Sequence, residues 1–436
     1  MQILSEYLKR FKIYITNSAW VFSSLVIRTL IVIFIVSKIA NHLGISDFGW
    51  YNFGISIFTI FYSISTLGFG DSFLIKYFVD GKTPPEEIIC TALIARIIGS
   101  LLLLIIILIW IVGFTDDYHN WVILIISTSI LFQSSEVFGA YYQWKLKANV
   151  SVPVTVISLI IVSILLIFGI TKNYGLFYFA IIYTLERVLI FFGLLWVINK
   201  EVPIRTFRFN VILFKLLFIQ SWPLLLGALL TALYSRFDQV LIKYFLTTAD
   251  LGVYGTSIIL SQIWLVFPSL IIPVLFPKIA QLKLDDDKKN YNNVLLVLYG
   301  ILNYTAIGVI LFIFIFGDFI VNMLYGKEYA DSVFILNILI LNLIFLFQSH
   351  LTSSIMILEN EEKYLFKLKL VSVLCNVLLN LILLSSLGVR FAAFSLLISS
   401  FISWVLMAMF NKKMYALLKL NCQSFLIPLH IKKILK

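Results

Sequence analysis

Residues 88–113 read IICTALIARIIGSLLLLIIILIWIVG, a run of 26 residues in which Arg96 is the only charged side chain. A helix needs about 20 mostly apolar residues to cross the hydrocarbon core of a bilayer, and this stretch exceeds that length. It shows no strict alternation of apolar and polar residues, which argues against a strand of a membrane β-barrel. The stretch therefore predicts a transmembrane helix.

The rest of the chain has the same character. Hydrophobic residues make up 61% of its 436 residues and charged residues only 13%, whereas a soluble domain is nearer half apolar and a quarter charged. Within a bilayer, backbone polar groups must be satisfied internally, so long apolar segments form helices. Such segments fall at 14–40, 48–75, 88–113, 121–143, 150–171, 174–198, 216–244, 251–277, 293–316, 331–357, 367–388 and 391–411. The sequence predicts an all-α polytopic membrane protein of about twelve transmembrane helices.

The distribution of basic residues predicts the orientation. Of the 33 Lys and Arg residues, 24 fall in alternate loops and the two ends, while 5 fall in the loops of the opposite face. Cytoplasmic loops carry the excess of positive charge, so we expect both termini in the cytoplasm of a bacterial inner membrane. We attribute the net charge of +11 to the basic cytoplasmic loops and to contact with membrane lipids, and we expect no nucleic-acid partner. The basic start and the long run after it predict a retained first helix and no cleaved leader.

The chain divides near its middle. A basic linker, 200–215, separates two sets of six segments, and the pentapeptides DFGWY at 47–51 and DLGVY at 250–254 occupy equivalent places in the two sets. Because six helices return the chain to its starting side, this pattern predicts two six-helix bundles arranged as parallel repeats. We expect an N-terminal bundle at 1–199, a cytoplasmic linker at 200–215, a C-terminal bundle at 216–411 and a basic cytoplasmic tail at 412–436.

Signals for catalysis, cofactors or metals are missing from the sequence. The three cysteines, Cys90, Cys375 and Cys422, are scattered, as are the four histidines, so neither a disulfide framework nor a metal site is expected. No phosphate-binding loop, zinc-protease motif or nucleophile elbow occurs. We expect no enzyme activity and no cofactor, with energy supplied by an ion gradient, the substrate gradient or consumption of the product.

Charged residues inside the predicted helices are the candidate functional residues. Such a charge costs about 2.5–3.5 kcal/mol on insertion scales and therefore marks a function by default, although internal ion pairing is the structural alternative. Arginines and acids occur in equal number; they are Arg28, Arg96, Arg187, Arg236, Asp71, Glu136, Glu186 and Asp238. Adjacent residues on a helix point about 100° apart, so the neighbours in Glu186–Arg187 are not natural partners.

Polar side chains follow single faces of several predicted helices. Ser129, Gln133 and Glu136 are spaced four and three apart, as are Thr231, Ser235 and Asp238. These steps keep side chains on one side of a helix. Hydrogen bonds between helices explain the Ser and Thr members well, but they explain Gln133 beside Glu136 less well. The stripes predict a polar, hydrated interior.

Several short motifs together resemble a known family. In order, they are NSAW at 17–20, HLGISDFGWY at 42–51, SRFDQ at 235–239, DLGVY at 250–254, LYGKEY at 324–329, NVLLN at 376–380 and GVRFAA at 388–393. Over essentially the whole chain these resemble the Wzx-type polysaccharide biosynthesis, or O-antigen, flippases of the multidrug/oligosaccharidyl-lipid/polysaccharide (MOP) exporter superfamily. One departure is Arg390, which stands in a motif that is otherwise of a glycine-glycine-alanine type.

This resemblance implies a V-shaped pair of bundles that works by alternating access. The implied substrate is an undecaprenyl-diphosphate-linked oligosaccharide, moved from the cytoplasmic to the outer leaflet, with a polysaccharide polymerase as a possible partner. A diphosphate matches the planar guanidinium group, so Arg28 and Arg236 are the leading head-group ligands, with Arg96 and Arg187 secondary. Glu136, Asp71, Asp238 and Gln133 are expected to position the arginines or to couple transport to H⁺ or Na⁺, with Glu136 first for coupling.

Two other functions fit the same composition. An ion-coupled drug or cation exporter of the same superfamily is one, but its interior should be dominated by acids, whereas arginines and acids are equal in number here. A membrane polysaccharide polymerase is the other, and the short predicted outer loops argue against it. The sequence favours the flippase.

Overall fold

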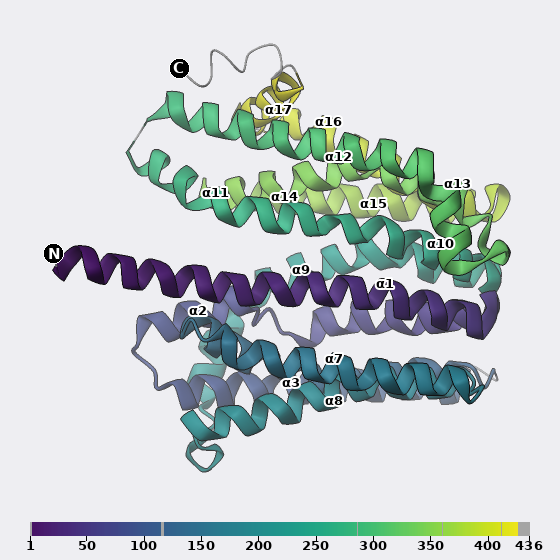
Figure 1. Cartoon of the computed structure of the whole chain (residues 1–436), viewed down its shortest axis with the longest axis horizontal. Coiled ribbons are helices and arrows are strands. Elements are labelled where there is room, and N and C mark those ends of the chain that lie inside the picture. Colours follow the sequence, from purple (N-terminus) through teal and green to yellow (C-terminus); the bar gives the residue numbers. More distant parts are fainter. Residues whose placement is uncertain (1, 115–116, 286, 360, 411, 426–436) are drawn as a thin grey trace. The chain divides into compact units, whose positions relative to one another are not determined.

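The computed structural model describes residues 2–114, 117–285, 287–359, 361–410 and 412–425, and these form helices joined by short connections (Figure 1). The chain divides into two compact units, residues 1–240 and 241–436. The boundary between them falls inside one long helix, α9. The bundle and linker boundaries expected from the sequence stay a prediction.

Among the described residues, unit 1 holds four complete long membrane-crossing helices, most of a fifth and several short ones. Its elements are α1 (Gln2–Ser65), α2 (Asp71–Asp80), α3 (Pro85–Phe114), α4 (Asn120–Ser127), α5 (Ser129–Gln133), α6 (Glu136–Trp144), α7 (Ala148–Thr171), α8 (Leu176–Glu201), η1 (Ile204–Thr206) and most of α9 (Val211–Phe245). The segment predicted at 121–143 is thus three short helices in succession. The segment predicted at 48–75 is also interrupted, because the helix ends at Ser65 and α2 begins at Asp71.

Helix α1 is two helices that meet at Gly44. The backbone there is non-helical, with φ 76° and ψ 171°, a conformation that is essentially restricted to glycine. Among the described residues, 11 stretches are long and apolar enough to cross a membrane, and one of them, Ala19–Ser65, has 47 residues. At 1.5 Å per residue that stretch is about twice the thickness of a bilayer core, so the turn at Gly44 makes it two spans. The chain is a multi-pass membrane protein with about twelve spans.

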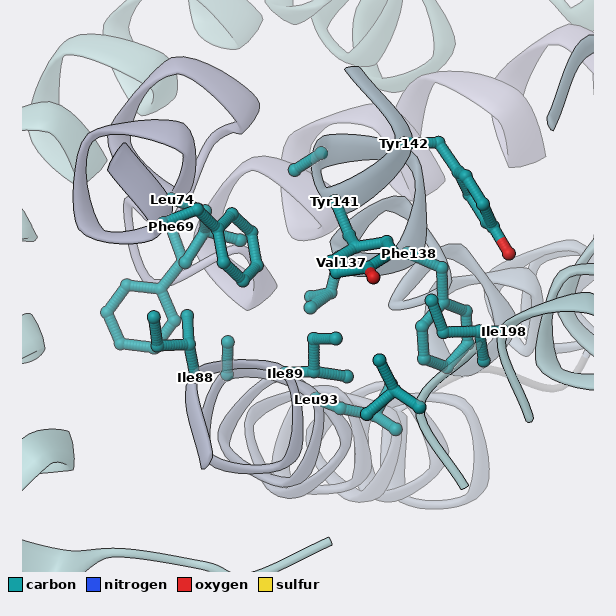
Figure 2. Packing of buried hydrophobic residues seen from close by; sticks show 14 of the residues in the cluster. Phe69, Leu74, Ile88, Ile89, Leu93, Val137, Phe138, Tyr141, Tyr142 and Ile198 are labelled. Carbon is teal, nitrogen blue, oxygen red and sulfur yellow. The ribbon is translucent and has the colours of Figure 1, made fainter. Parts of the chain in front are cut away.

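A buried hydrophobic cluster organises one end of unit 1 (Figure 2). Phe69 and Leu74 approach it from either side of the start of α2, while Val137 and Phe138 come from α6 and Ile89 from α3. The side chains of Phe69, Leu74, Val137 and Phe138 are completely buried. Because close packing fixes the helices that carry them, it also fixes Asp71, which lies between Phe69 and Leu74, and Glu136, which directly precedes Val137.

Unit 2 contains the remaining helices. They are α10 (Thr248–Gln262), η2 (Ile263–Leu265), α11 (Val266–Leu284), α12 (Lys288–Tyr325), η3 (Lys327–Tyr329), α13 (Ser332–Leu341), α14 (Leu343–Leu358), α15 (Glu362–Leu387), α16 (Val389–Phe410) and α17 (Lys412–Ser424). Helices α15 and α16 form a hairpin, and α13 and α14 both pack on α12. The structure describes no β-strand between residues 2 and 425, which agrees with the all-α prediction.

The basic tail expected after residue 411 begins with an ordered helix. Helix α17 packs on α12 and α16 and buries Met414, Leu417, Asn421 and Ser424. The buried Asn303 side chain of α12 donates to Asn421 Oδ1 at 3.0 Å and to Ser424 Oγ at 2.8 Å. These bonds satisfy polar groups that would be costly to bury alone. The last part of the predicted tail, 426–436, lies outside the described residues.

A cluster of charges joins α17 to two helix connections of unit 2. Glu359 Oε1 lies 3.0 Å from Lys283 Nζ and accepts a hydrogen bond from Tyr291 at 3.0 Å, while Lys413 Nζ lies 3.5 Å from Glu359 Oε2. Burial raises the pKa of Glu359, but the hydrogen bonds from Lys283 and Tyr291 and the two lysine charges outweigh it, so the net pKa is lowered. The charged carboxylate is therefore favoured in the folded protein.

We expect this cluster to make stability depend on pH. Because the folded-state pKa of Glu359 is depressed below its usual value near 4.5, its contribution is present above that value and is lost as the pH falls through the lower, folded-state pKa. Glu359→Gln should lower the unfolding midpoint at pH 7 and flatten its decline in acid. Thermal unfolding of the detergent-solubilised variant at several pH values measures this. An unchanged acid dependence would contradict the assignment.

Candidate functional site

Two arginines and one glutamate meet inside unit 1 and are called here the arginine cluster. Arg28 Nη2 of α1 lies 2.8 Å from Glu186 Oε1 of α8, and Arg187 Nη1 lies 3.8 Å from the same oxygen. The close contact is an ion pair whose angles do not meet hydrogen-bond geometry, since Glu186 Oε1 has no hydrogen-bond partner among the described residues. Two guanidinium groups thus face one carboxylate, which leaves the cluster with a net positive charge.

The members of the arginine cluster differ in exposure. The side chain of Arg28 is 36% exposed, that of Arg187 17% and that of Glu186 only 9%. Within the described part of the chain, the buried Nε of Arg187 has no hydrogen-bond partner. Guanidinium groups with donors to spare suit an anion with several acceptor oxygens, such as a phosphate. The cluster can therefore bind an anion at Arg28 without breaking its link to α8.

Aromatic rings line the arginine cluster. The guanidinium carbon of Arg187 lies 5.9 Å from the ring centroid of Tyr183, and Tyr183 packs edge-on against Tyr51 and Phe58 at 6.1 Å and 5.7 Å. Such contacts hold a guanidinium in a fixed position. Arg236, on the α9 segment that belongs to unit 1, is within electrostatic range of Tyr183. The structure thus brings three of the four predicted arginines into one neighbourhood.

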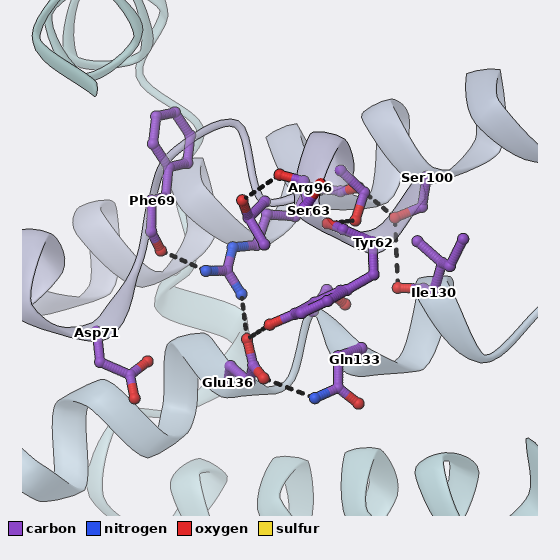
Figure 3. Close-up of polar contacts among 12 residues, drawn as sticks. Tyr62, Ser63, Phe69, Asp71, Arg96, Ser100, Ile130, Gln133 and Glu136 are labelled. Carbon is purple, nitrogen blue, oxygen red and sulfur yellow. Dashed lines mark hydrogen bonds and ion pairs between the residues drawn. The ribbon is translucent and has the colours of Figure 1, made fainter. Parts of the chain in front are cut away.

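The fourth arginine belongs to a second group, called here the carboxylate cluster: Arg96, Glu136 and Asp71 (Figure 3). Arg96 Nη1 lies 3.2 Å from Glu136 Oε2, and Arg96 Nη2 donates to the backbone carbonyl of Phe69. Glu136 also accepts hydrogen bonds from Tyr62 and, at 2.6 Å, from Gln133 Nε2. Three side chains from three helices therefore donate to one carboxylate.

Asp71 completes the carboxylate cluster from the first turn of α2. It lies within electrostatic range of Glu136 and Arg96, and Gln143 Nε2 of α6 donates to its Oδ2 at 3.1 Å. Figure 3 shows its carboxylate on the same side of Arg96 as Glu136. Two carboxylates thus lie within electrostatic range of one guanidinium, so this cluster carries a net negative charge where the other carries a positive one.

The two clusters are neighbours. Arg187 feels the charge of Glu136, and the ring of Phe58 packs against both Tyr62 and Tyr183, with centroids 5.9 Å and 5.7 Å away. Tyr62 binds the carboxylate cluster and Tyr183 the arginine cluster. A change of charge in one cluster therefore changes the electrostatic energy of the other, from which it is separated by the rings of Tyr62, Phe58 and Tyr183.

The other predicted residues have separate roles. Asp238 is completely buried and accepts a hydrogen bond from the backbone N–H of Gln239 at 2.8 Å. Gln239 in turn accepts from Ser56 at 2.8 Å, which links α9 to α1. Arg96 is only 2% exposed, which does not favour a direct contact with a head group. The ligand and coupling roles predicted for all these residues stay predictions.

Sequence analysis missed the aromatic members of both clusters. Tyr62 and Tyr183 carry no charge, and tyrosine is common in this chain, with 21 residues. The one available signal was spacing: Phe58 and Tyr62 stand four apart and so share a helix face. That signal does not name the group that each tyrosine meets, Glu136 for Tyr62 and Arg187 for Tyr183.

We expect the removal of Arg96 to destabilise the protein more than to impair binding. Arg96→Ala leaves the Phe69 carbonyl without its side-chain donor and takes the cationic partner away from Glu136. Breaking a buried ion pair costs about 3–5 kcal/mol. Because the Glu136 side chain is 32% exposed, we expect the lower end, about 3 kcal/mol. Membrane levels and the thermal unfolding midpoint measure this loss. A variant as stable as the parent chain would contradict the structural role.

Comparison with known sequences places the chain in a family. The sequence pattern of the family described as "Polysaccharide biosynthesis protein" matches residues 39–334. The capsular polysaccharide biosynthesis protein CapF of Staphylococcus aureus is 24% identical over 395 residues, covering 88% of this chain and 95% of that protein. A probable low-salt glycan biosynthesis flippase of Haloferax volcanii is 25% identical over 175 residues, covering 40% of this chain and 37% of that protein.

Comparison with solved structures identifies the fold. An inward-facing multidrug resistance MATE transporter of the MOP superfamily aligns with a TM-score of 0.67 at 14% identity, covering 89% of this chain and 96% of that one. The lipid II flippase MurJ, in an inward closed conformation, aligns with a TM-score of 0.66 at 18% identity, covering 94% and 90%. These likenesses confirm the predicted all-α membrane fold of about twelve helices, of the type found in the MOP superfamily.

Proposed function

The chain belongs to the polysaccharide biosynthesis protein family, and on that premise we propose that it is a flippase for undecaprenyl-diphosphate-linked oligosaccharide repeat units. It carries them from the cytoplasmic to the outer leaflet of a bacterial inner membrane by alternating access. The family and the glycan-related names of its relatives support this proposal, and so does a fold shared with a lipid flippase. The observation that carries it is the net positive, partly exposed arginine cluster in membrane-spanning helices.

The arginine cluster supplies the head-group site. Arg28 donates to the diphosphate first, because its side chain is the most exposed of the cluster. Glu186 holds Arg28 and Arg187 together when no substrate is bound. When the diphosphate binds, its oxygens accept hydrogen bonds from guanidinium N–H groups that the single Glu186 carboxylate does not engage. Arg236 contributes positive charge from α9.

The carboxylate cluster supplies the coupling site. With two carboxylates and one guanidinium, it lacks one positive charge, and H⁺ or Na⁺ would restore neutrality. Glu136 already accepts from Tyr62, Arg96 and Gln133 and so serves mainly to position Arg96. Asp71 has fewer donors, the Gln143 amide being the one described, and is therefore the group that takes up the cation. Loss of that cation restores the attraction for Arg96.

A drug or cation exporter is the second candidate, because a MATE transporter shares the fold. Its substrates would need a negative binding surface, whereas the more exposed of the two clusters is positive at Arg28. A polymerase is disfavoured because the fold is shared with a transporter and with a lipid flippase. Such a polymerase would instead be a partner that consumes the flipped product.

A deletion strain complemented with the wild-type gene tests the proposal. Loss of surface glycan, with lipid-linked repeat units accumulating on the inner leaflet, is the result expected of a flippase. Repeat units that reach the outer leaflet but stay unpolymerised would make this chain a polymerase. Intact glycan in the deletion strain would favour the exporter. Accessibility of the lipid-linked sugars to a glycosidase added outside spheroplasts separates the first two outcomes.

A further inference from the structure

The interruption between α1 and α2 contains the most strained backbone of this region. Residues 66–70 are non-helical, and two successive residues have positive φ, Leu67 at 51° and Gly68 at 75°. A leucine in the left-handed region is unfavourable, because its Cβ atom comes too close to the following carbonyl oxygen. Strain of this kind persists only where the surroundings impose it, and it tends to cluster at functional elements. What surrounds these five residues is therefore informative.

On one side the interruption touches the backbone of α9. Ser221, completely buried, donates its hydroxyl to the carbonyl of Leu67 at 2.7 Å. A Cβ atom on Gly68 would lie 2.3 Å from the carbonyl oxygen of Ser221 and 2.9 Å from the amide nitrogen of Leu225. The two backbones are thus in direct contact, with no flexible side chain between them. Only glycine fits at position 68.

The contact falls where α9 is weakened. Pro223, two residues after Ser221, has no N–H, so the helix lacks one hydrogen bond to the carbonyl of Ile219. Proline at such a position is the usual cause of a kink. A second bond, from the Tyr77 hydroxyl of α2 to Gln220 Oε1 at 2.7 Å, holds the same turn. Helix α9 is therefore held by the interruption, through Leu67, and by α2, through Tyr77, at the turn that Pro223 weakens.

On its other side the interruption meets the carboxylate cluster. Arg96 donates to the carbonyl of Phe69 (Figure 3), and Asp71 is the first residue of α2 after the interruption. A movement of the Arg96 guanidinium toward or away from the carboxylates therefore acts on the Phe69 carbonyl. One residue, Gly68, separates Phe69 from Leu67, whose carbonyl accepts the hydrogen bond from Ser221. The contact with α9 and the contact with Arg96 thus fall on either side of a residue with positive φ.

We propose that residues 66–70 and Ser221 form a joint through which the charge of the carboxylate cluster positions α9, the helix that carries Arg236. The proposal rests on the proposed function, because it makes the coupling site act on the head-group site. Leu67, Gly68 and Ser221 are positioning residues and touch neither cation nor diphosphate. Because the backbone of residues 66–70 touches the backbone of α9 directly, a small displacement of these residues moves α9 as well. Packed interiors switch between discrete arrangements and do not deform continuously.

The test measures whether the charge cluster and α9 are coupled. The native residues Cys90, Cys375 and Cys422 are replaced by serine, and Thr231→Cys places a reporter on the unit 1 part of α9, where the side chain is exposed. The alkylation rate of this reporter by a maleimide is measured in proteoliposomes. Asp71→Asn and Glu136→Gln should each change the rate about twofold or more. With Ser221→Ala present, the same substitutions should have little effect.

Two matched variants serve as controls. Ser158→Ala also removes the hydroxyl of a buried serine, but one that bonds its own helix at Val154. Gly227→Ala adds a methyl group to α9 where nothing lies within 4 Å. Both should preserve the coupling, whereas Gly68→Ala should abolish it. If that variant does not fold, Ser221→Ala, which leaves the backbone intact, decides the question.

Equal effects of the charge substitutions with and without Ser221→Ala would overturn the joint. That result would leave the flippase proposal standing, because alkylation needs no substrate. Conversely, a failure of the flippase proposal would appear in the surface glycan of the deletion strain while the coupling persisted. The two failures are therefore distinguishable.

Discussion

Replacing Arg28 by alanine is expected to reduce transport of the lipid-linked substrate about tenfold to a hundredfold, with normal amounts of protein in the membrane. Hydrogen bonds to charged groups contribute about 1.5–3 kcal/mol each, and 1.4 kcal/mol corresponds to a factor of ten. Stability should be largely retained, because the Arg28 side chain is 36% exposed and Glu186 keeps Arg187 nearby. Surface glycan in the complemented deletion strain and membrane levels of the variant are the two measurements.

Two variants sharpen the Arg28 prediction. Arg28→Lys keeps the charge but loses the planar fork that matches a diphosphate, so we expect an intermediate loss. Lys147→Ala is the matched control, because Lys147 also pairs with a glutamate at 2.8 Å, Glu201, but between membrane spans. It should transport normally, since exposed ion pairs contribute little. Undiminished glycan in Arg28→Ala would remove Arg28 from the head-group site.

The arginine cluster shows where sequence reasoning succeeds and where it stops. The sequence alone shows a charged residue inside an apolar segment, so Arg28, Arg187 and Glu186 were all predicted as candidates. Their pairing was not, because Arg28 and Glu186 stand in different helices far apart in the chain. Helix geometry did predict that adjacent Glu186 and Arg187 would be poor partners. The structure agrees in part, since their contact at 3.8 Å is the longer of the two that Glu186 makes.

The interrupted helices illustrate a different limit. Apolar length predicts that a segment spans the membrane, and the segments predicted at 48–75 and 121–143 both have counterparts among the spans. Length does not show where a helix breaks inside the span. Gly68 and Gly70 give a signal before Asp71, but the interruptions near Thr128 and Ser134 have no glycine or proline to mark them. At the break between Ser65 and Asp71, the structure adds a tertiary contact of Ser221 with Leu67 that apolar length does not reveal.

The carboxylate cluster leads to the second large effect, on ion coupling. We expect Asp71→Asn to make transport independent of an imposed proton or sodium gradient, because it removes the charge that the cation neutralises. One carboxylate would then face one guanidinium, so the cluster would be neutral without any bound ion. Inward and outward gradients applied to proteoliposomes that contain a fluorescent polyprenyl-diphosphate sugar measure this directly. A variant that still responds fully to either gradient would exclude Asp71 as the coupling group.

Glu136→Gln separates coupling from positioning in the same assay. Tyr62, Arg96 and Gln133 all donate to the Glu136 carboxylate, and an amide offers them only one oxygen. We therefore expect a lower unfolding midpoint and slower transport at every gradient, with the response of the remaining activity to the gradient preserved. Asp71→Asn should show the reverse pattern, near-normal stability with the response lost. If Glu136→Gln abolished the response instead, Glu136 would be the coupling group and Asp71 would hold Arg96 in its place.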